Sequence, residues 1–235
     1  MLEYIIKLII VICLVMFIVL IATYIELYTK FDYKYTKINI DDIYDMIETG
    51  DVIYFSYANF IKPYFSHVAL AIVDDKNNKY ILEINGDNKR RVYKSNKGGV
   101  SFSSLKTRLM TFRIGEPSCD IYLLKLRNDK VPSLEKTLGF INKITDYKNT
   151  YQYNNKFINK IIFDCTRKKL LDMKVNDKRY GDNNLICSEF IMLCLMDLGI
   201  IQHDNISCKT PEEFLMLKDN NKKLYDKNYY VILDK

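Results

Sequence analysis

The sequence predicts an α+β fold with an antiparallel sheet, preceded by one N-terminal transmembrane helix. Three observations support this prediction. Residues 8–25 are apolar and uncharged, several later segments are β-branched runs of strand length, and two more carry apolar residues at helical spacing. The 235 residues, 49% of them hydrophobic, are enough for a buried core, and no internal repeat or linker indicates a second globular domain.

Composition narrows the classes of protein to consider. Eight Gly and four Pro exclude collagen-like and low-complexity chains, and 12 Phe with 19 Tyr exclude global disorder. A net charge of +6 that is spread along the chain does not indicate a nucleic-acid-binding surface. The six cysteines form no Cys-x-x-Cys pair and there are only two histidines, so we expect free thiols, no metal site and no cofactor.

Residues 8–25 form the predicted membrane anchor. As a helix with 1.5 Å rise per residue, this uncharged stretch would extend about 27 Å, close to the thickness of the hydrocarbon core. It is longer than the apolar part of most signal peptides and lacks a small-residue cleavage site. We therefore expect a single-pass membrane protein. The flanking lysines weakly favour a body on the cytosolic, reducing side, in a host or virion membrane.

The predicted organisation is an anchor at 1–28, a polar tether at 29–40 and one body at 41–235, with an insert at about 128–180. Asp41 is the expected N-cap of the first helix, and Gly50 ends the segment that follows it. In the first half of the body we expect a helix over 41–48, strands over 51–55, 67–73 and 80–84, a short helix from Ser103 or Ser104 to Met110, and a strand over 121–126.

The second half of the body is expected to be mainly helical. Pro132 favours a helix start, and the strongest helical pattern ends at Gly199. The expected elements are a helix from Pro132 to about Thr145, a loop at 146–156, a mixed helical segment to Leu171, a helix over 185–198, a short helix that begins at Thr210 and an edge strand over 224–233.

Cys187 is the candidate nucleophile. Polar residues 182–184 precede the helix predicted over 185–198, so Cys187 is expected in its first turn. The N–H groups and the dipole at a helix N-terminus favour a thiolate and can hold an oxyanion. Cys194 lies two turns later on the same apolar face, where we expect it to belong to the core.

A cysteine nucleophile needs a base, and His67 is the better placed of the two histidines. It begins an apolar strand, where a rigid element would hold its imidazole, although a surface histidine with an ordinary hydrogen bond is the alternative. His203 lies in a polar loop. Glu83 is a carboxylate among apolar residues, which requires a partner, and it is the candidate for orienting His67. Because sequence does not fix the hairpin register, Asn85 remains an alternative third group.

Four short motifs occur in an order that resembles a known family. They are Gly50-Asp51 before an apolar strand, Ser66-His67 before another, Glu83, and Cys187-Ser188-Glu189 at a helix start. In this order they resemble the circularly permuted papain-like enzymes of the NlpC superfamily, the YaeF/YiiX-type amidases. Relatives of these enzymes include a poxvirus branch and lecithin retinol acyltransferase-like proteins. Residues 100–105 and Thr210-Pro211 add to the resemblance, which covers roughly residues 40–217.

The resemblance implies a permuted papain-like fold, in which an antiparallel sheet packs on the helix that bears the cysteine. It implies Cys187 as nucleophile, His67 as base and Glu83 as the orienting residue. Two features depart from the family pattern, namely the predicted anchor and the insert at about 128–180. Because the insert can reshape the substrate cleft, the resemblance leaves the substrate open.

The sequence therefore predicts a membrane-anchored cysteine hydrolase, amidase- or peptidase-like, that forms a thioester acyl-enzyme. A lipid-directed phospholipase or acyltransferase of the same fold is an alternative. Another is a catalytically silent interaction protein of a membrane or virion. The expected partners are a lipid bilayer, through residues 8–25, and a peptide or acyl-lipid substrate. No nucleic-acid partner is expected, and the oligomeric state is not predicted.

Overall fold

The computed structural model describes residues 2–30, 35–57, 67–85, 99–115, 119–153, 183–202, 214 and 217–232. The chain divides into two compact units, Met1–Lys34 and Tyr35–Lys235. Two predicted elements, the helical segment ending at Leu171 and the short helix that begins at Thr210, lie outside the described residues.

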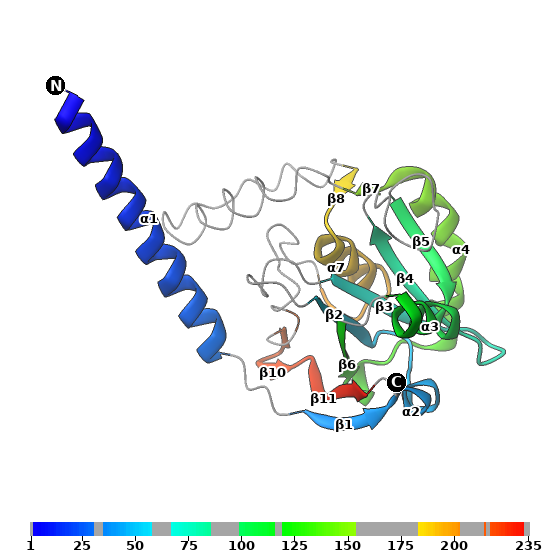
Figure 1. The fold of residues 1–235 in the computed structure, drawn as a ribbon. Helices are drawn as coiled ribbons and strands as arrows, with labels where there is room; N and C mark the ends of the chain where they lie inside the picture. The colour runs from blue at the N-terminus through cyan, green and yellow to red at the C-terminus, as the bar shows by residue number, and fades with distance from the viewer. Residues whose placement is uncertain are drawn as a thin grey trace. The chain divides into compact units, whose positions relative to one another are not determined.

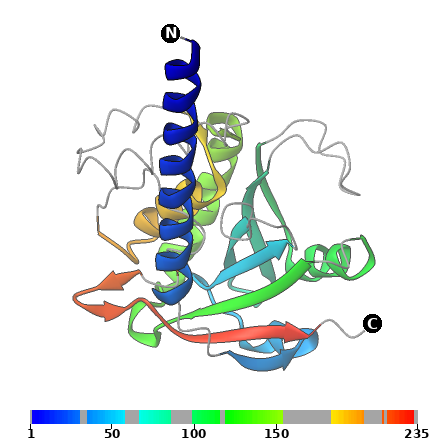
Figure 2. The same cartoon turned by 60° about the vertical axis from the view of Figure 1, so that its left-hand side comes forward.

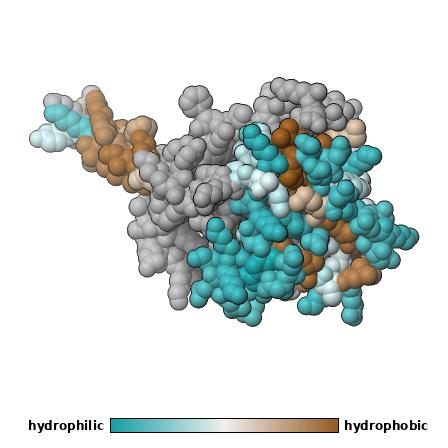
Figure 3. Space-filling model, turned by 90° about the horizontal axis from the view of Figure 1, so that it is seen from below, coloured by the Kyte–Doolittle hydropathy of each residue, from teal (hydrophilic) through white to brown (hydrophobic). Residues whose placement is uncertain are grey.

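The first unit consists of helix α1 (Leu2–Lys30), whose hydrophobic surface is brown in Figure 3. The prediction of a transmembrane helix is wrong, because no helix in the described part of the chain is both long and apolar enough to cross a membrane. The predicted single-pass location depended on this helix and is wrong with it, and the predicted cytosolic side of the body was inferred from the flanks of the same helix.

The second unit is α+β and is organised around one seven-stranded sheet with the order β1-β11-β6-β2-β3-β4-β5 (Figure 1). Its strands are β1 (Thr36–Asn39), β2 (Val52–Tyr57), β3 (His67–Val73), β4 (Lys79–Asn85), β5 (Gly99–Ser104), β6 (Cys119–Leu126) and β11 (Tyr225–Ile232). β1 runs parallel to β11, and the other neighbours are antiparallel. The sheet is therefore mixed, and the predicted wholly antiparallel sheet is wrong. The parallel pair arises because part of the predicted tether joins the sheet.

Helices cover both faces of this sheet (Figure 2). α7 (Cys187–Asp197) and α4 (Leu134–Thr150) pack on one face, whereas α2 (Ile40–Met46) and α3 (Leu105–Gly115) pack on the other. Side chains alternate between these faces along β3. Val68 and Leu70 belong to the core under α7, and Ala69 and Ala71 belong to the core under α2 and α3. We call the two sides the α7 face and the α3 face.

Two small sheets complete the described structure. They are β7 (Gln152–Tyr153) with β8 (Asn184–Leu185), which are parallel, and β9 (Lys218–Asp219) with β10 (Lys222–Lys223), which are antiparallel. β8 comes two residues before Cys187, so the β7–β8 pair fixes the approach of the chain to α7.

Asp51 joins the start of β2 to the end of β6. Its Oδ1 accepts the Leu126 N–H at 2.8 Å, and its Oδ2 accepts both the Glu48 N–H and the Lys125 ammonium at 2.8 Å. Burial raises the pKa of Asp51 to about 6, against the lowering effect of Lys125. These bonds fix the ends of two central strands, which gives Asp51 of the Gly50-Asp51 motif a structural role.

Gly50 allows three elements to meet. Its φ is 98°, a region that L-residues with a side chain rarely occupy. A Cβ at this position would lie 2.6 Å from Cδ2 of Leu126 in β6 and 2.8 Å from Cδ1 of Ile200, just beyond α7. The backbone conformation therefore requires glycine, and a Cβ here would also displace the ends of the Leu126 and Ile200 side chains.

Several element boundaries differ from the sequence prediction. α2 begins at Ile40, after a turn in which the Asp42 carboxylate accepts the Asn39 N–H at 3.2 Å, and not after an Asp41 cap. β11 is not an edge strand, because β1 pairs with it on its outer side. β5 was not predicted as a strand, and α4 continues into the predicted loop at 146–156 as far as Thr150.

Candidate active site

His67 and Glu83 are hydrogen-bonded to each other. His67 is the first residue of β3, and Glu83 lies on the neighbouring strand β4. His67 Nε2 lies 2.8 Å from Glu83 Oε2, and both side chains are buried. The register, in which Leu70 pairs with Leu82, sets the two residues diagonally on one face of the sheet. The sequence alone could not fix this β3–β4 register, and the choice between Glu83 and Asn85 depended on it. Asn85 lies at the end of β4, where it pairs with Gly99.

Arg108 is a third member of the site that the sequence analysis missed. Its Nε donates to Glu83 Oε1 at 2.7 Å and its Nη2 to Glu83 Oε2 at 3.1 Å, so the guanidinium binds the carboxylate through both oxygens. Arg108 is 5% exposed. A signal was present in the sequence, because Arg108 lies beside Leu109 and one turn after Leu105, on the buried side of α3.

Phe55 completes the cluster from β2. Its ring stacks on the His67 ring with centroids 5.8 Å apart, and the Arg108 Cζ lies 5.6 Å from the same Phe55 ring. Phe55 pairs directly with His67 in the β2–β3 register. The imidazole and the guanidinium therefore both lie near the Phe55 ring, and the Glu83 carboxylate joins them to each other on the α3 face.

The charges in this group determine how its protons are held. Burial alone would raise the pKa of Glu83, but the His67 hydrogen bond and the Arg108 charge outweigh it and lower the pKa to about 2. Glu83 is therefore an acceptor at neutral pH, and the His67 ring donates to it through Nε2. The neutral tautomer that can donate in this way carries its basic lone pair on Nδ1.

Cys187 is the first residue of α7 and is 2% exposed. Glu189 supports this helix start, because its Oε2 accepts the Ile186 N–H at 3.2 Å. Cys194 lies in the same helix, and burial raises the pKa of its thiol well above the usual value. The structure thus places Cys187 at the helix N-terminus, where the helix dipole acts, and Cys194 in the core.

Cys187 and His67 lie at the same end of the sheet. β8, just before α7, pairs with β7, which lies against β4 and β5. Tyr151, just before β7, is next to Gly99 at the start of β5. Gly99 pairs with Asn85, and continuing the β3–β4 register brings Asn85 opposite His67.

The two residues belong to opposite faces of the sheet. Cys187 is part of the core on the α7 face, together with Val68 and Leu70. His67 stacks on Phe55, which is part of the core on the α3 face. The structure therefore unites His67 with Glu83 and Arg108, and brings Cys187 to the same sheet end from the other side.

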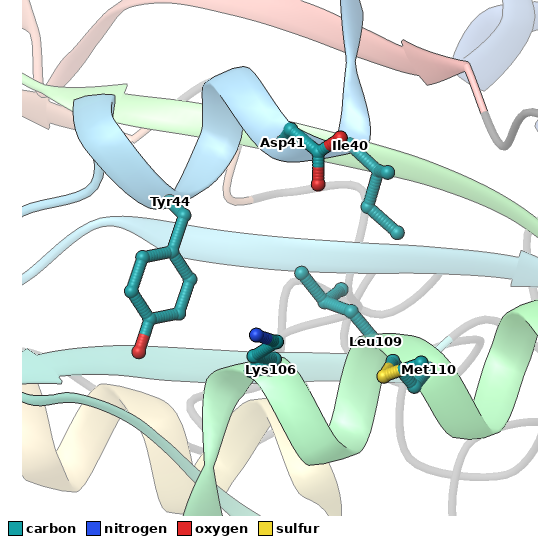
Figure 4. A pocket seen from close by; sticks show the side chains of 6 residues that line it. All are labelled: Ile40, Asp41, Tyr44, Lys106, Leu109 and Met110. Carbon is teal, nitrogen blue, oxygen red and sulfur yellow. The ribbon is translucent and has the colours of Figure 1, made fainter.

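A separate pocket of about 350 Å³ lies between α2 and α3 (Figure 4). It is lined by Ile40, Asp41, Tyr44, Lys106, Leu109 and Met110. It contains neither the predicted nucleophile nor the predicted base. Within the described ranges, no group of three His, Cys, Asp or Glu side chains is arranged to hold a metal ion.

Comparison with known proteins does not assign a family. No family model matches the sequence, and no curated protein matches it either.

Proposed function

We propose that the chain is a cysteine hydrolase of amidase or peptidase type, with Cys187 as nucleophile, His67 as general base and Glu83 as the residue that orients the imidazole. The observation that carries the proposal is the buried contact of 2.8 Å between His67 Nε2 and Glu83 Oε2, at the sheet end from which α7 begins. A carboxylate that fixes the tautomer of a histidine near a helix-start cysteine is the arrangement that nucleophilic thiol catalysis needs.

The roles of the three residues follow from this arrangement. His67 Nδ1 takes the proton of Cys187, and the thiolate attacks the carbonyl carbon of the substrate. N–H groups in the first turn of α7 hold the oxyanion. The imidazolium then gives its proton to the leaving amine or alcohol, and water hydrolyses the thioester with His67 again acting as base. In the proposal His67 acts from the first position of β3, and its ring must reach past the end of this strand to the thiol.

A second candidate function is a non-catalytic role for the same fold. One observation favours it, because the His67 ring packs on the α3 face and Cys187 belongs to the core of the α7 face. In this case the His67–Glu83–Arg108 group would only link β3, β4 and α3.

An acylation experiment separates the two candidates. The full chain is treated with p-nitrophenyl acetate, and acetylated cysteines are located by peptide mass spectrometry. The thiolate displaces p-nitrophenolate, so the proposal predicts an acetyl thioester on Cys187 that hydroxylamine removes. It also predicts that the adduct is absent from Cys187→Ala and forms at least about 100-fold more slowly in His67→Ala, the scale of general-base catalysis. Cys13, which is exposed, serves as the reference thiol. Equal labelling in wild type and His67→Ala would overturn the proposal.

A further inference from the structure

We propose that Arg108 is a positioning residue of this site: its guanidinium holds both oxygens of Glu83, so that the carboxylate keeps one orientation toward His67 and its negative charge is neutralised. The inference rests on the proposed function for its catalytic meaning, and on geometry alone for the arrangement itself. It adds a residue from α3, an element that carries none of the predicted site residues.

The first step of the argument is geometric. A carboxylate held by one hydrogen bond can rotate about its Cγ–Cδ bond and swing on its side-chain torsions. The two bonds from Arg108, at 2.7 Å and 3.1 Å, end on different oxygens and fix the plane of the Glu83 carboxylate. Oε2 is thereby held where His67 Nε2 meets it at 2.8 Å. The orientation of the imidazole is thus set from α3 through Glu83.

The second step is electrostatic. An unneutralised carboxylate at 2.8 Å would stabilise the imidazolium form of His67 and make it a poor base at neutral pH. Arg108 is buried beside the same carboxylate and supplies the opposite charge. Among the described residues, β4 contributes Glu83, α3 contributes Arg108, and β2 contributes the uncharged ring of Phe55 to this group. The Glu83–Arg108 pair carries no net charge, so the carboxylate does not by itself keep His67 protonated, and in the proposal the imidazole takes its proton from a thiol.

Arginine suits this place better than lysine would. Its planar fork binds both carboxylate oxygens and can also lie against an aromatic ring, whereas an ammonium is a point charge. Arg108 does both, because it binds Glu83 and lies 5.6 Å from the Phe55 ring centroid. Arg108→Lys therefore keeps the charge but loses the fixed plane, and Arg108→Gln loses the charge.

The test is an NMR titration of the His67 imidazole in the full chain. Only two histidines are present, and His203→Gln assigns their ring signals. In Arg108→Gln the midpoint of the His67 titration is expected to move to higher pH by about one unit, the scale of an unneutralised neighbouring charge. In Arg108→Lys the midpoint stays near the wild-type value, while acetylation of Cys187 by p-nitrophenyl acetate slows about tenfold or more. Arg127→Gln, which removes a surface pair with Asp129, is the matched control and is expected to change neither readout.

An unchanged His67 midpoint in folded Arg108→Gln would overturn the inference. If Arg108→Gln does not fold, a measurement on the wild-type protein tests the same inference. The Nε–H proton of Arg108 should exchange slowly with solvent, and its chemical shift should change at the pH at which His67 titrates. A proton that exchanges fast and whose chemical shift does not change as His67 titrates would count against the proposal. Because the titration needs no catalysis, its failure is distinct from failure of Cys187 to acylate, which concerns the proposed function.

Discussion

Glu83 is the residue on which the buried charges of the α3 face depend. Its carboxylate receives the His67 ring and two donors from Arg108, and its side chain is 2% exposed. A buried charge is costly unless it is paired, so this residue and its arginine have to be present together. The sequence made Glu83 a candidate because a carboxylate among apolar residues needs a partner. It did not name Arg108, since that partner comes from a helix 25 residues later.

Glu83→Gln removes the charge and leaves the size of the side chain unchanged. We expect it to lower the free energy of unfolding by about 3–5 kcal/mol at neutral pH, because Arg108 is left buried without a counter-charge. Urea denaturation at pH 7 measures this difference. Glu48→Gln is the matched control, because Glu48 pairs with Lys125 but is 49% exposed. Its expected cost is within about 1 kcal/mol. Equal costs for the two variants would contradict the buried ion pair.

Wild type and Glu83→Gln should also differ in how their free energy of unfolding depends on pH, and the pKa of Glu83 sets the sign of this difference. The pKa of Glu83 is lowered to about 2 in the folded chain, below the unfolded value of about 4.3. Its stabilisation is therefore present above about pH 4.3 and is lost as the pH falls toward 2. The stability difference between wild type and Glu83→Gln should narrow over this range and be constant above pH 5.

At the scale of elements, the junction of β2, β6 and α7 determines how α7 lies on the sheet. Gly50 lies at this junction, with side-chain atoms of Leu126 and Ile200 where its Cβ would be. We expect Gly50→Ala to destabilise the protein by about 1–3 kcal/mol, from overpacking and from the strained positive φ.

Gly139 supplies the control for this substitution. It lies in α4 with no atom within 4 Å of the Cβ position. Gly139→Ala should therefore stabilise the protein by about 0.5–1 kcal/mol, through helix propensity alone. Thermal or urea unfolding of the two variants measures both effects. If Gly50→Ala leaves the free energy of unfolding unchanged, the junction is not closely packed.

The elements that sequence predicted best are those whose pattern depends on local burial. The run His67–Val73 is buried along nearly its whole length, and it forms β3 with the predicted bounds. β5 was missed because its Gly and Ser residues carry no strand signal, and pairing with β4 makes it a strand. β11 was predicted as an edge because the tether was not expected to supply β1. Long-range pairing decided both outcomes.

At the scale of the whole molecule, the sheet separates the two halves of the proposed chemistry. The His67–Glu83–Arg108 group lies on the α3 face, and Cys187 begins α7 on the opposite face. Sequence could predict Cys187, His67 and Glu83 and the element that carries each one, but not Arg108. It could not predict the face of His67, because β3 is apolar on both sides and long-range packing decides which helices cover each side.

The measurement that tests the central claim most directly is the pH dependence of iodoacetamide alkylation at single cysteines, in full-length wild type and His67→Ala. Peptide mass spectrometry reports Cys187, Cys194 and Cys13 separately, and the last two provide a buried and an exposed reference thiol. If Cys187 and His67 form a thiolate–imidazolium pair, Cys187 is alkylated at lower pH than Cys13, and His67→Ala abolishes this difference. If Cys187 reacts as slowly as Cys194 in both proteins, the pair does not exist, and the fold serves a non-catalytic role.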